Sequence, residues 1–209
     1  MEDIAQSKQI SIFSDKATSS DVFKGRLEDQ ELLCSVSALA ERHERILSMF
    51  DQKEFNQQGV YKITLRKTGR PFKVLIDDFL PCEPEAGLIF SYSKENEFWV
   101  SLLEKAMAKL YGSYIHLRHV PMRHALFDLT GYPTFTYHFD DAQVKKFFAR
   151  GKFWDQIRLW DRQGFILVTK TRDELESGAG LVAAQSYNLV DVLNVDGHKL
   201  FKLHNPWGE

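Results

Sequence analysis

The chain has few cysteines, and this scarcity excludes several classes of protein. Only Cys34 and Cys82 are present among its 209 residues. Two cysteines cannot build the disulfide framework of a small secreted domain, nor a zinc site with four cysteine ligands. We therefore expect reduced thiols and a cytoplasmic location.

Long apolar runs and an excess of charge of either sign are also missing. The longest apolar runs, such as residues 165–168, fall far short of the about 20 residues that a membrane-spanning helix needs. The first residues include acids and lack an apolar stretch, so we expect no secretory signal. The 27 basic and 29 acidic side chains give a net charge of −2. This balance offers no broad basic surface, and we expect no nucleic-acid partner.

The first two thirds of the chain carry mostly helical patterns. Residues 1–20 are polar and serine-rich, and we expect a loose lead-in there. Apolar residues recur at three- and four-residue spacing over 30–50 and over 96–111, which predicts two helices. Asp29 is the expected N-cap of the first helix, and Gly112 suits the C-terminal end of the second. Residues 59–68 and 71–78 predict a hairpin between these helices.

The pattern changes after Gly131 and Pro133, which mark a candidate domain boundary. Residues 141–150 favour a helix, and residues 164–171 favour a buried strand. Residues 187–195 and 198–204 favour two strands joined by the turn pair Asp196-Gly197. The sequence therefore predicts an α+β protein, with a helical lobe over residues 21–131 and a lobe dominated by strands over residues 132–209.

Five segments, in order, resemble blocks of the calpain protease core. They are residues 74–81 (VLIDDFLP), 96–106 (NEFWVSLLEKA), 108–114 (AKLYGSY), 127–131 (FDLTG) and 205–209 (NPWGE). The resemblance covers about residues 21–209. It implies a papain-like cysteine-protease fold with an active site between its two lobes. Because the family's sheet lobe continues beyond the last block, it also implies a truncated antiparallel sheet here, whose open edge could pair with a protein partner.

The family's chemistry needs a cysteine nucleophile, a histidine base and an orienting asparagine, and two of these three are absent here. The nucleophile position carries Gln30, the base position carries Gln185, and only Asn205 keeps its type. The family's oxyanion-binding glutamine is replaced by Lys24, while the cleft residue Trp207 is retained. Carboxamides neither form thiolates nor titrate near neutral pH.

Other residues could in principle replace the missing groups. Cys34 shares a helical stripe with Gln30 but lies one turn deeper, where the helix dipole has faded and a buried structural thiol is the simpler interpretation. His204 is next to Asn205, yet adjacent strand residues face opposite sides of a sheet. Cys82 lies in a proline-flanked turn. Three histidines lie close in sequence, at His116, His119 and His124, but their spacing does not favour a metal site.

The resemblance also implies a calcium site in the first lobe. Its two carboxylate positions correspond to Asp21 and Glu97, and both keep an acid. Because Ca²⁺ takes about six to eight oxygen ligands, backbone carbonyls would have to supply the others. The simpler interpretation is a solvated Asp21 and a Glu97 that favours the start of a helix.

Two functions of different class follow. The first is a catalytically inactive calpain-like domain, a pseudoprotease that acts as scaffold, regulator or interaction module for other proteins. The alternative is a calcium-dependent intracellular cysteine endopeptidase of the calpain family with shifted catalytic residues.

Overall fold

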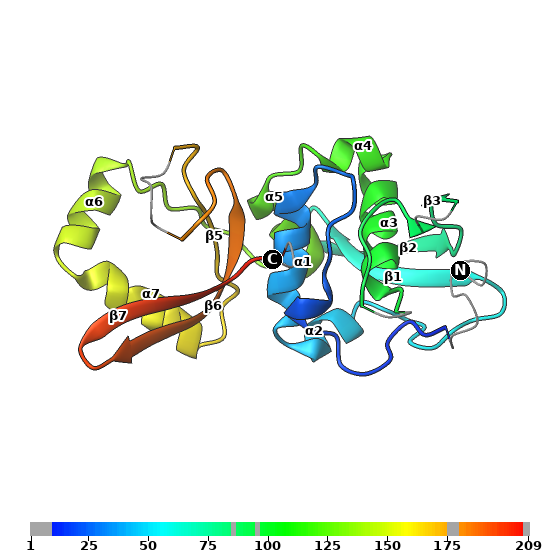
Figure 1. Ribbon diagram of the computed structural model, residues 1–209, viewed down its shortest axis with the longest axis horizontal. Helices are drawn as coiled ribbons and strands as arrows, with labels where there is room; N and C mark the ends of the chain where they lie inside the picture. Colours follow the sequence, from blue (N-terminus) through cyan, green and yellow to red (C-terminus); the bar gives the residue numbers. More distant parts are fainter. Residues whose placement is uncertain (1–9, 85–86, 95–96, 175–179, 207–209) are drawn as a thin grey trace.

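The computed structural model describes residues 10–84, 87–94, 97–174 and 180–206. Two lobes lie side by side, and helix α1 of the first faces a small sheet of the second (Figure 1). The mixture of helices with small antiparallel sheets is the predicted α+β architecture. None of the described helices is long and apolar enough to cross a membrane.

The first lobe is built from helices around a hairpin. Its elements are η1 (Ser19–Asp21), α1 (Gln30–Ala40), α2 (His43–Leu47), β1 (Val60–Lys67), β2 (Arg70–Asp77), β3 (Cys82–Glu83), β4 (Gly87–Leu88), α3 (Trp99–Tyr111), α4 (Tyr114–Leu117) and α5 (Met122–Thr130). The predicted hairpin is confirmed, with Lys67 opposite Arg70. Thr68 and Gly69 both have positive φ, as a two-residue hairpin turn requires. The predicted end of α3 is also confirmed, because Gly112 closes it in a left-handed conformation.

The single helix predicted over residues 30–50 is wrong. The chain leaves the helix after Ala40, adopts an extended conformation at Arg42, and begins α2 at His43. Beyond α2 the backbone joins β1 instead, because the Met49 carbonyl accepts a hydrogen bond of 2.7 Å from the Thr64 amide. Backbone groups that pair with a strand are unavailable to a helix, and this ends the helical pattern early.

The predicted loose lead-in is also wrong for residues 10–18, whereas residues 1–9 lie outside the described part. Ile12 is fully buried. The Phe13 ring stacks on Trp99 at 6.2 Å and meets the edge of Phe50 at 5.1 Å. This segment packs because its few apolar side chains complete the core of the first lobe.

The second lobe contains more helix than the sequence pattern predicted. Its elements are α6 (Ala142–Ala149), α7 (Lys152–Arg162), β5 (Val168–Lys170), β6 (Ser186–Val195) and β7 (His198–His204). The sheet has the antiparallel order β5-β6-β7, and the predicted turn at Asp196-Gly197 joins its last two strands. Helix α7 was missed, although its apolar residues recur at helical spacing. They are Phe153, Trp154, Ile157 and Trp160.

Each lobe has its own hydrophobic cluster, and the two differ greatly in size. The first extends from Ile12 to Leu129 and includes the fully buried Trp99. The second has four buried members, namely Phe153, Trp154, Ile157 and Val192. The proposed boundary between residues 131 and 132 falls between these clusters and stays a prediction.

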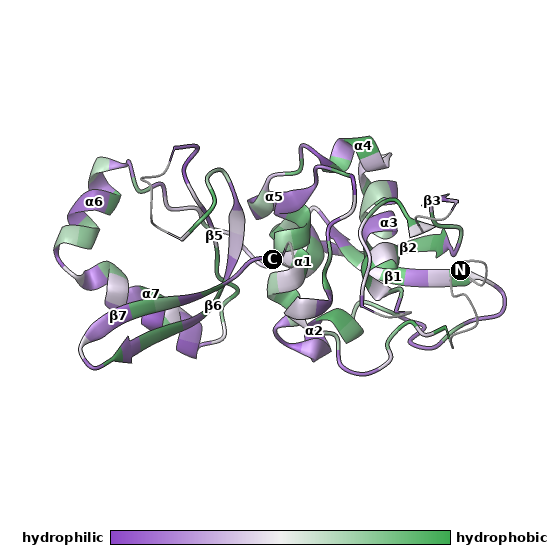
Figure 2. Cartoon of the chain, viewed as in Figure 1, coloured by the Kyte–Doolittle hydropathy of each residue, from purple (hydrophilic) through white to green (hydrophobic). Residues whose placement is uncertain are grey.

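Helix α1 is buried over most of its length. Every residue from Leu32 to Ala40 is buried. One side packs against α5 of its own lobe and the other packs against β6 of the second lobe. Figure 2 shows α1 as a largely hydrophobic helix where the two lobes meet. Burial on all sides explains why the helix has no polar face along this stretch.

Candidate functional site

The candidate site lies where α1 meets the sheet of the second lobe. Successive turns of α1 contact successive positions of the sheet. The contacts are Glu31 Oε1 to Lys170 Nζ at 2.7 Å, Cys34 Sγ to Asn188 Oδ1 at 3.4 Å, and Ser37 Oγ to His204 Nδ1 at 3.3 Å. The strand register pairs Lys170 with Ser186 and Asn188 with His204. The start of α1 is therefore directed to the end of β6 that begins at Ser186.

The fold brings the three predicted triad positions to this end of the interface. Gln30 is the first residue of α1 and is half-buried. Gln185 immediately precedes β6. Asn205 follows His204, the last residue of β7, so it lies at the same end of the β6–β7 pair. Trp207, the predicted cleft residue, lies outside the described residues.

The backbone of Gln185 is fixed by hydrogen bonds, whereas its side-chain oxygen lacks a hydrogen-bond donor within the described part of the chain. Its amide donates to Thr171 Oγ1 at 2.9 Å, and its carbonyl accepts from the Thr171 amide at 2.8 Å. The side-chain Oε1 is buried, and no donor reaches it among the described residues. With Gln30 and Asn205 this makes three carboxamides, which can exchange hydrogen bonds but supply neither thiolate nor base.

Cys34 is poorly suited to act as a nucleophile. Its side chain is fully buried, and its thiol donates to Asn188. Burial, with the negative charge of Glu31 as a second cause, raises the pKa of the Cys34 thiol well above its usual range. A reactive cysteine needs both access and a stabilised thiolate. The thiol at this position has neither.

His204 and Cys82 are also placed away from any nucleophilic arrangement. The His204 ring faces α1 through Ser37, and burial lowers its pKa. Cys82 is an exposed free thiol whose Sγ lies 3.0 Å from the Leu80 carbonyl oxygen. Within the described ranges, no cluster of three or more histidine, cysteine or acidic residues could hold a metal ion. The His116 ring contacts the backbone instead of a neighbouring histidine, because its Nδ1 donates to the Tyr111 carbonyl oxygen at 2.9 Å.

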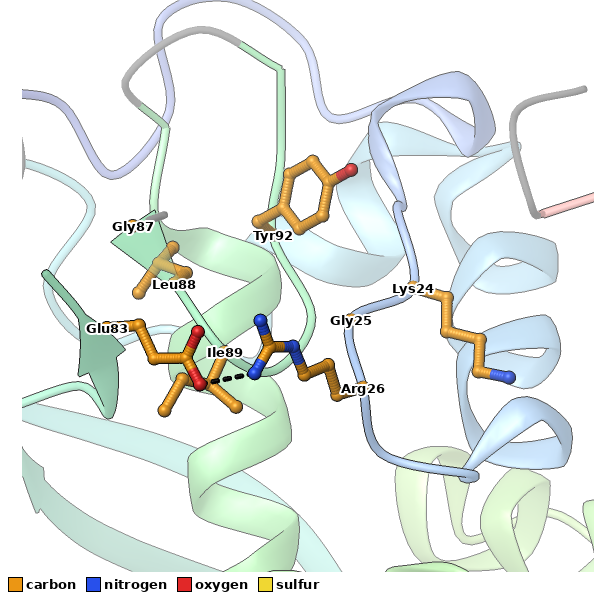
Figure 3. Close-up of a pocket in the computed structure, with 8 residues that line it drawn as sticks. All are labelled: Lys24, Gly25, Arg26, Glu83, Gly87, Leu88, Ile89 and Tyr92. Carbon is orange, nitrogen blue, oxygen red and sulfur yellow. Dashed lines mark hydrogen bonds and ion pairs between the residues drawn. The ribbon is translucent and has the colours of Figure 1, made fainter. Parts of the chain in front are cut away.

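Lys24, at the predicted oxyanion position, borders a pocket of about 240 Å³ between its own segment and strands β3 and β4 (Figure 3). An ion pair between Arg26 and Glu83 crosses the pocket, and the Lys24 side chain points away from it. Gly25 approaches the backbone so closely that a Cβ there would lie 2.2 Å from the Phe90 carbonyl oxygen. Only glycine fits this position without a backbone shift.

Two buried acids, Asp29 and Glu104, meet beside the start of α1. Asp29 was predicted to cap the helix, but its carboxyl makes no capping hydrogen bond. Both side chains are only 2% exposed. If both acids were ionised, Asp29 Oδ1 and Oδ2 and Glu104 Oε1 would have no hydrogen-bond donor among the described residues. One proton shared by the two acids supplies the hydrogen bond between them. The pair therefore favours a state with one proton.

Burial, modified by neighbouring groups, explains the titration of this pair. Burial raises the pKa of Asp29 to about 6, against the lowering effects of its hydrogen bond to Glu104 and the charge of Lys24. Burial and the charge of Asp29 raise the pKa of Glu104 well above its ordinary value. Ser91 opposes this, because its amide and hydroxyl donate to Glu104 Oε2 at 3.0 and 2.7 Å. The sequence pattern alone contained no signal for this acid pair.

The two predicted calcium ligands belong to neighbouring segments. Phe23 and Tyr92 exchange backbone hydrogen bonds and stack their rings at 5.3 Å, which holds these segments together. Asp21 accepts from the Thr18 amide and hydroxyl at 2.7 and 2.8 Å. The buried Glu97 accepts from the Ser14 amide at 2.7 Å. Oxygen donors of this kind fit calcium, and two carboxylates leave most ligands to backbone carbonyls.

Several residues of the interface were missed by the sequence analysis. Glu31, Lys170, Ser37 and Asn188 connect the two lobes. One available signal was the presence of the small residues Cys34 and Ser37 within the largely apolar stretch from Leu32 to Ala40. Such residues in a buried helix need hydrogen-bond partners from another element.

Comparison with known proteins gives one consistent result. The model of the calpain family cysteine protease domain matches residues 1–209. The calpain-type cysteine protease DEK1 of Zea mays is 38% identical over 209 residues, covering 98% of this chain and 10% of the relative. Human Calpain-14 is 33% identical over 205 residues, covering 93% and 29%. Calpain-5 of Caenorhabditis elegans is 29% identical over 236 residues, covering 95% and 36%. The chain thus spans a tenth to about a third of the length of these relatives.

Proposed function

Since this chain belongs to the calpain family of cysteine proteases, we propose that it is a family member without peptidase chemistry, a pseudoprotease domain that serves as scaffold, regulator or interaction module. The observation that carries this proposal is the glutamine at the nucleophile position, at the first residue of α1. That position holds the reacting sulfur in the family, because a helix N-terminus favours a thiolate. A carboxamide there has no nucleophilic electron pair to offer near neutral pH.

The surroundings of Gln30 support the same conclusion. The base position is a second carboxamide, Gln185, whose backbone is tied to Thr171. The thiol nearest in sequence, Cys34, is buried and donates a hydrogen bond to Asn188. Loss of nucleophile and base together removes nearly all catalysis by such a triad, on the order of a million-fold in comparable enzymes.

The alternative, a calcium-dependent cysteine endopeptidase, is favoured by the relatives, which are named calpain-type cysteine proteases. It would require Cys34 to become exposed and ionised. Calcium binding by Asp21 and Glu97 is a separate proposal and is compatible with either function. Calorimetric titration of the chain with Ca²⁺, compared with its Glu97→Gln variant, tests calcium binding independently of catalysis.

Partners and location are further proposals. Strand β7 ends the described sheet order, and its residues from His198 to Lys202 are exposed. An exposed edge strand can pair with an extended segment of another protein. Both cysteines are free thiols, which agrees with a cytoplasmic location.

The proposed loss of activity is tested by peptidase assays on casein and fluorogenic peptides over a wide range of calcium concentrations. We expect no turnover above that of the Cys34→Ala variant, because the nucleophile and base positions are amides. The double variant Gln30→Cys with Gln185→His should not become an efficient protease, since Lys24 still replaces the oxyanion-binding amide. Calcium-stimulated turnover that disappears in Cys34→Ala would contradict the proposal and support the endopeptidase.

A further inference from the structure

We propose that the contacts of Glu31, Cys34 and Ser37 with the second lobe form a built-in clamp that holds the two lobes in one arrangement without any added ligand. This set of contacts, with Lys170, Asn188 and His204 on the other side, is called the interlobe clamp. Such a clamp would operate whether or not the chain had peptidase activity.

Glu31 connects three elements through one carboxylate. Its Oε1 pairs with Lys170 of β5 at 2.7 Å. Its Oε2 accepts from the amide of Met122, the first residue of α5, at 2.8 Å. The bond to Met122 orients the carboxylate, so that it is already aimed at Lys170. Glu31 thus ties the two lobes together.

Asn188 is the centre of the buried part of the clamp. It is 1% exposed. Its Oδ1 accepts from the Cys34 thiol at 3.4 Å, and its Nδ2 donates to Ser37 Oγ at 2.8 Å. Ser37 Oγ also lies 3.2 Å from the Ser19 carbonyl and 3.3 Å from His204 Nδ1. These groups satisfy one another only in this one register, and buried polar networks are costly to leave partly satisfied.

A further contact secures the far end of the interface. Arg45 of α2 donates to the Gly164 carbonyl, just beyond α7, at 2.6 Å. The Arg42 guanidinium packs on the same glycine, where a Cβ would lie 2.4 Å from Arg42 Nη2. The contacts therefore extend from the first turn of α1 to the helix that follows it. Separation of the lobes would have to break them along this whole length.

Cys34 is a natural reporter of the clamp, because its thiol is fully shielded and contacts Asn188 of the other lobe. The exposed Cys82 is removed by Cys82→Ser, so that reaction with a disulfide reagent such as dithionitrobenzoate reports Cys34 alone. The rate is measured in the presence of a calcium chelator. We expect Cys34 to react far more slowly than in the urea-unfolded chain.

Two variants weaken the clamp from opposite lobes. Lys170→Met removes the cation and keeps the stem, while Glu31→Gln keeps an acceptor for the Met122 amide. Each should raise the rate about threefold, as expected for a partly exposed ion pair, and the double variant should show no further rise. The two substitutions change the charge near the Cys34 thiol in opposite directions. A faster reaction of Cys34 in both variants therefore reports opening of the interface. Asn188→Ala should raise the rate about tenfold or more.

The matched control is Arg172→Met, which removes an exposed ion pair with Asp140. It should leave the rate unchanged. The proposal is overturned if Lys170→Met and Arg172→Met have equal effects. It is equally overturned if Cys34 reacts in the chelator as fast as in the unfolded chain, because the lobes would then be apart without a ligand.

Discussion

At the scale of single residues, the buried pair of Asp29 and Glu104 gives the clearest dependence on pH. The ordinary pKa of an aspartate is near 3.8, and that of Asp29 is about 6 in the fold. The protonated form is therefore favoured by folding. Its contribution to stability is complete below the ordinary value and is lost as the pH rises through about 6.

Glu104→Gln should weaken this loss. An amide can donate to the Asp29 carboxylate without a bound proton, so the variant removes the titration of Glu104, while the burial that raises the pKa of Asp29 remains. Between pH 4.5 and pH 7.5, its free energy of unfolding should improve relative to the parent by about 1–3 kcal/mol. Urea denaturation at several pH values measures this difference. Parallel profiles of variant and parent would contradict the shared proton, and Asp140→Asn, at an exposed acid, serves as the control.

At the scale of single elements, helix α6 depends on its cap more than on burial. None of its residues is buried. Its N-cap Asp141 accepts from the amides of Gln143 and Val144 at 2.7 and 3.3 Å. Asp141→Ala should destabilise the helix locally by about 1 kcal/mol, which is about a fivefold faster amide exchange over residues 143–146. Asp140→Ala removes a neighbouring carboxylate that makes no cap and should change the exchange little; equal effects of both variants would assign the result to charge alone.

The elements also show where periodicity in the sequence is sufficient. The β1–β2 hairpin, α3 with its terminal Gly112, and the β6–β7 hairpin follow from local patterns and turn residues. The predicted strand over residues 164–171 is reduced to Val168–Lys170, the residues that lie in register with Ser186–Asn188 of β6. The extent of a strand depends on its neighbour, which the local pattern does not contain.

At the scale of the whole molecule, the unequal hydrophobic clusters predict unequal stability of the lobes. The second cluster has four buried apolar residues, far fewer than the first cluster has. The segment after Gly131 is strongly exposed, with Tyr132 at 74% and Phe135 at 78%. Limited proteolysis should therefore cut first near residues 131–139, and amide exchange should be faster in α6 and α7 than in α1 and α3. Early cuts within α3, with the second lobe intact, would refute this order.

The sequence by itself determined the family and the class of fold, because these depend on which residues stand in recognisable motifs. The assignment of Gln30, Gln185 and Asn205 to the triad positions rests on their flanking residues alone and stays a prediction. Only the tertiary structure decided what surrounds them. Hydrogen bonds such as Cys34 to Asn188, and the pairing of Asp29 with Glu104, join residues separated by 154 and 75 positions. Contacts at such separations depend on how the lobes pack, and packing also decided that α1 is buried on every side.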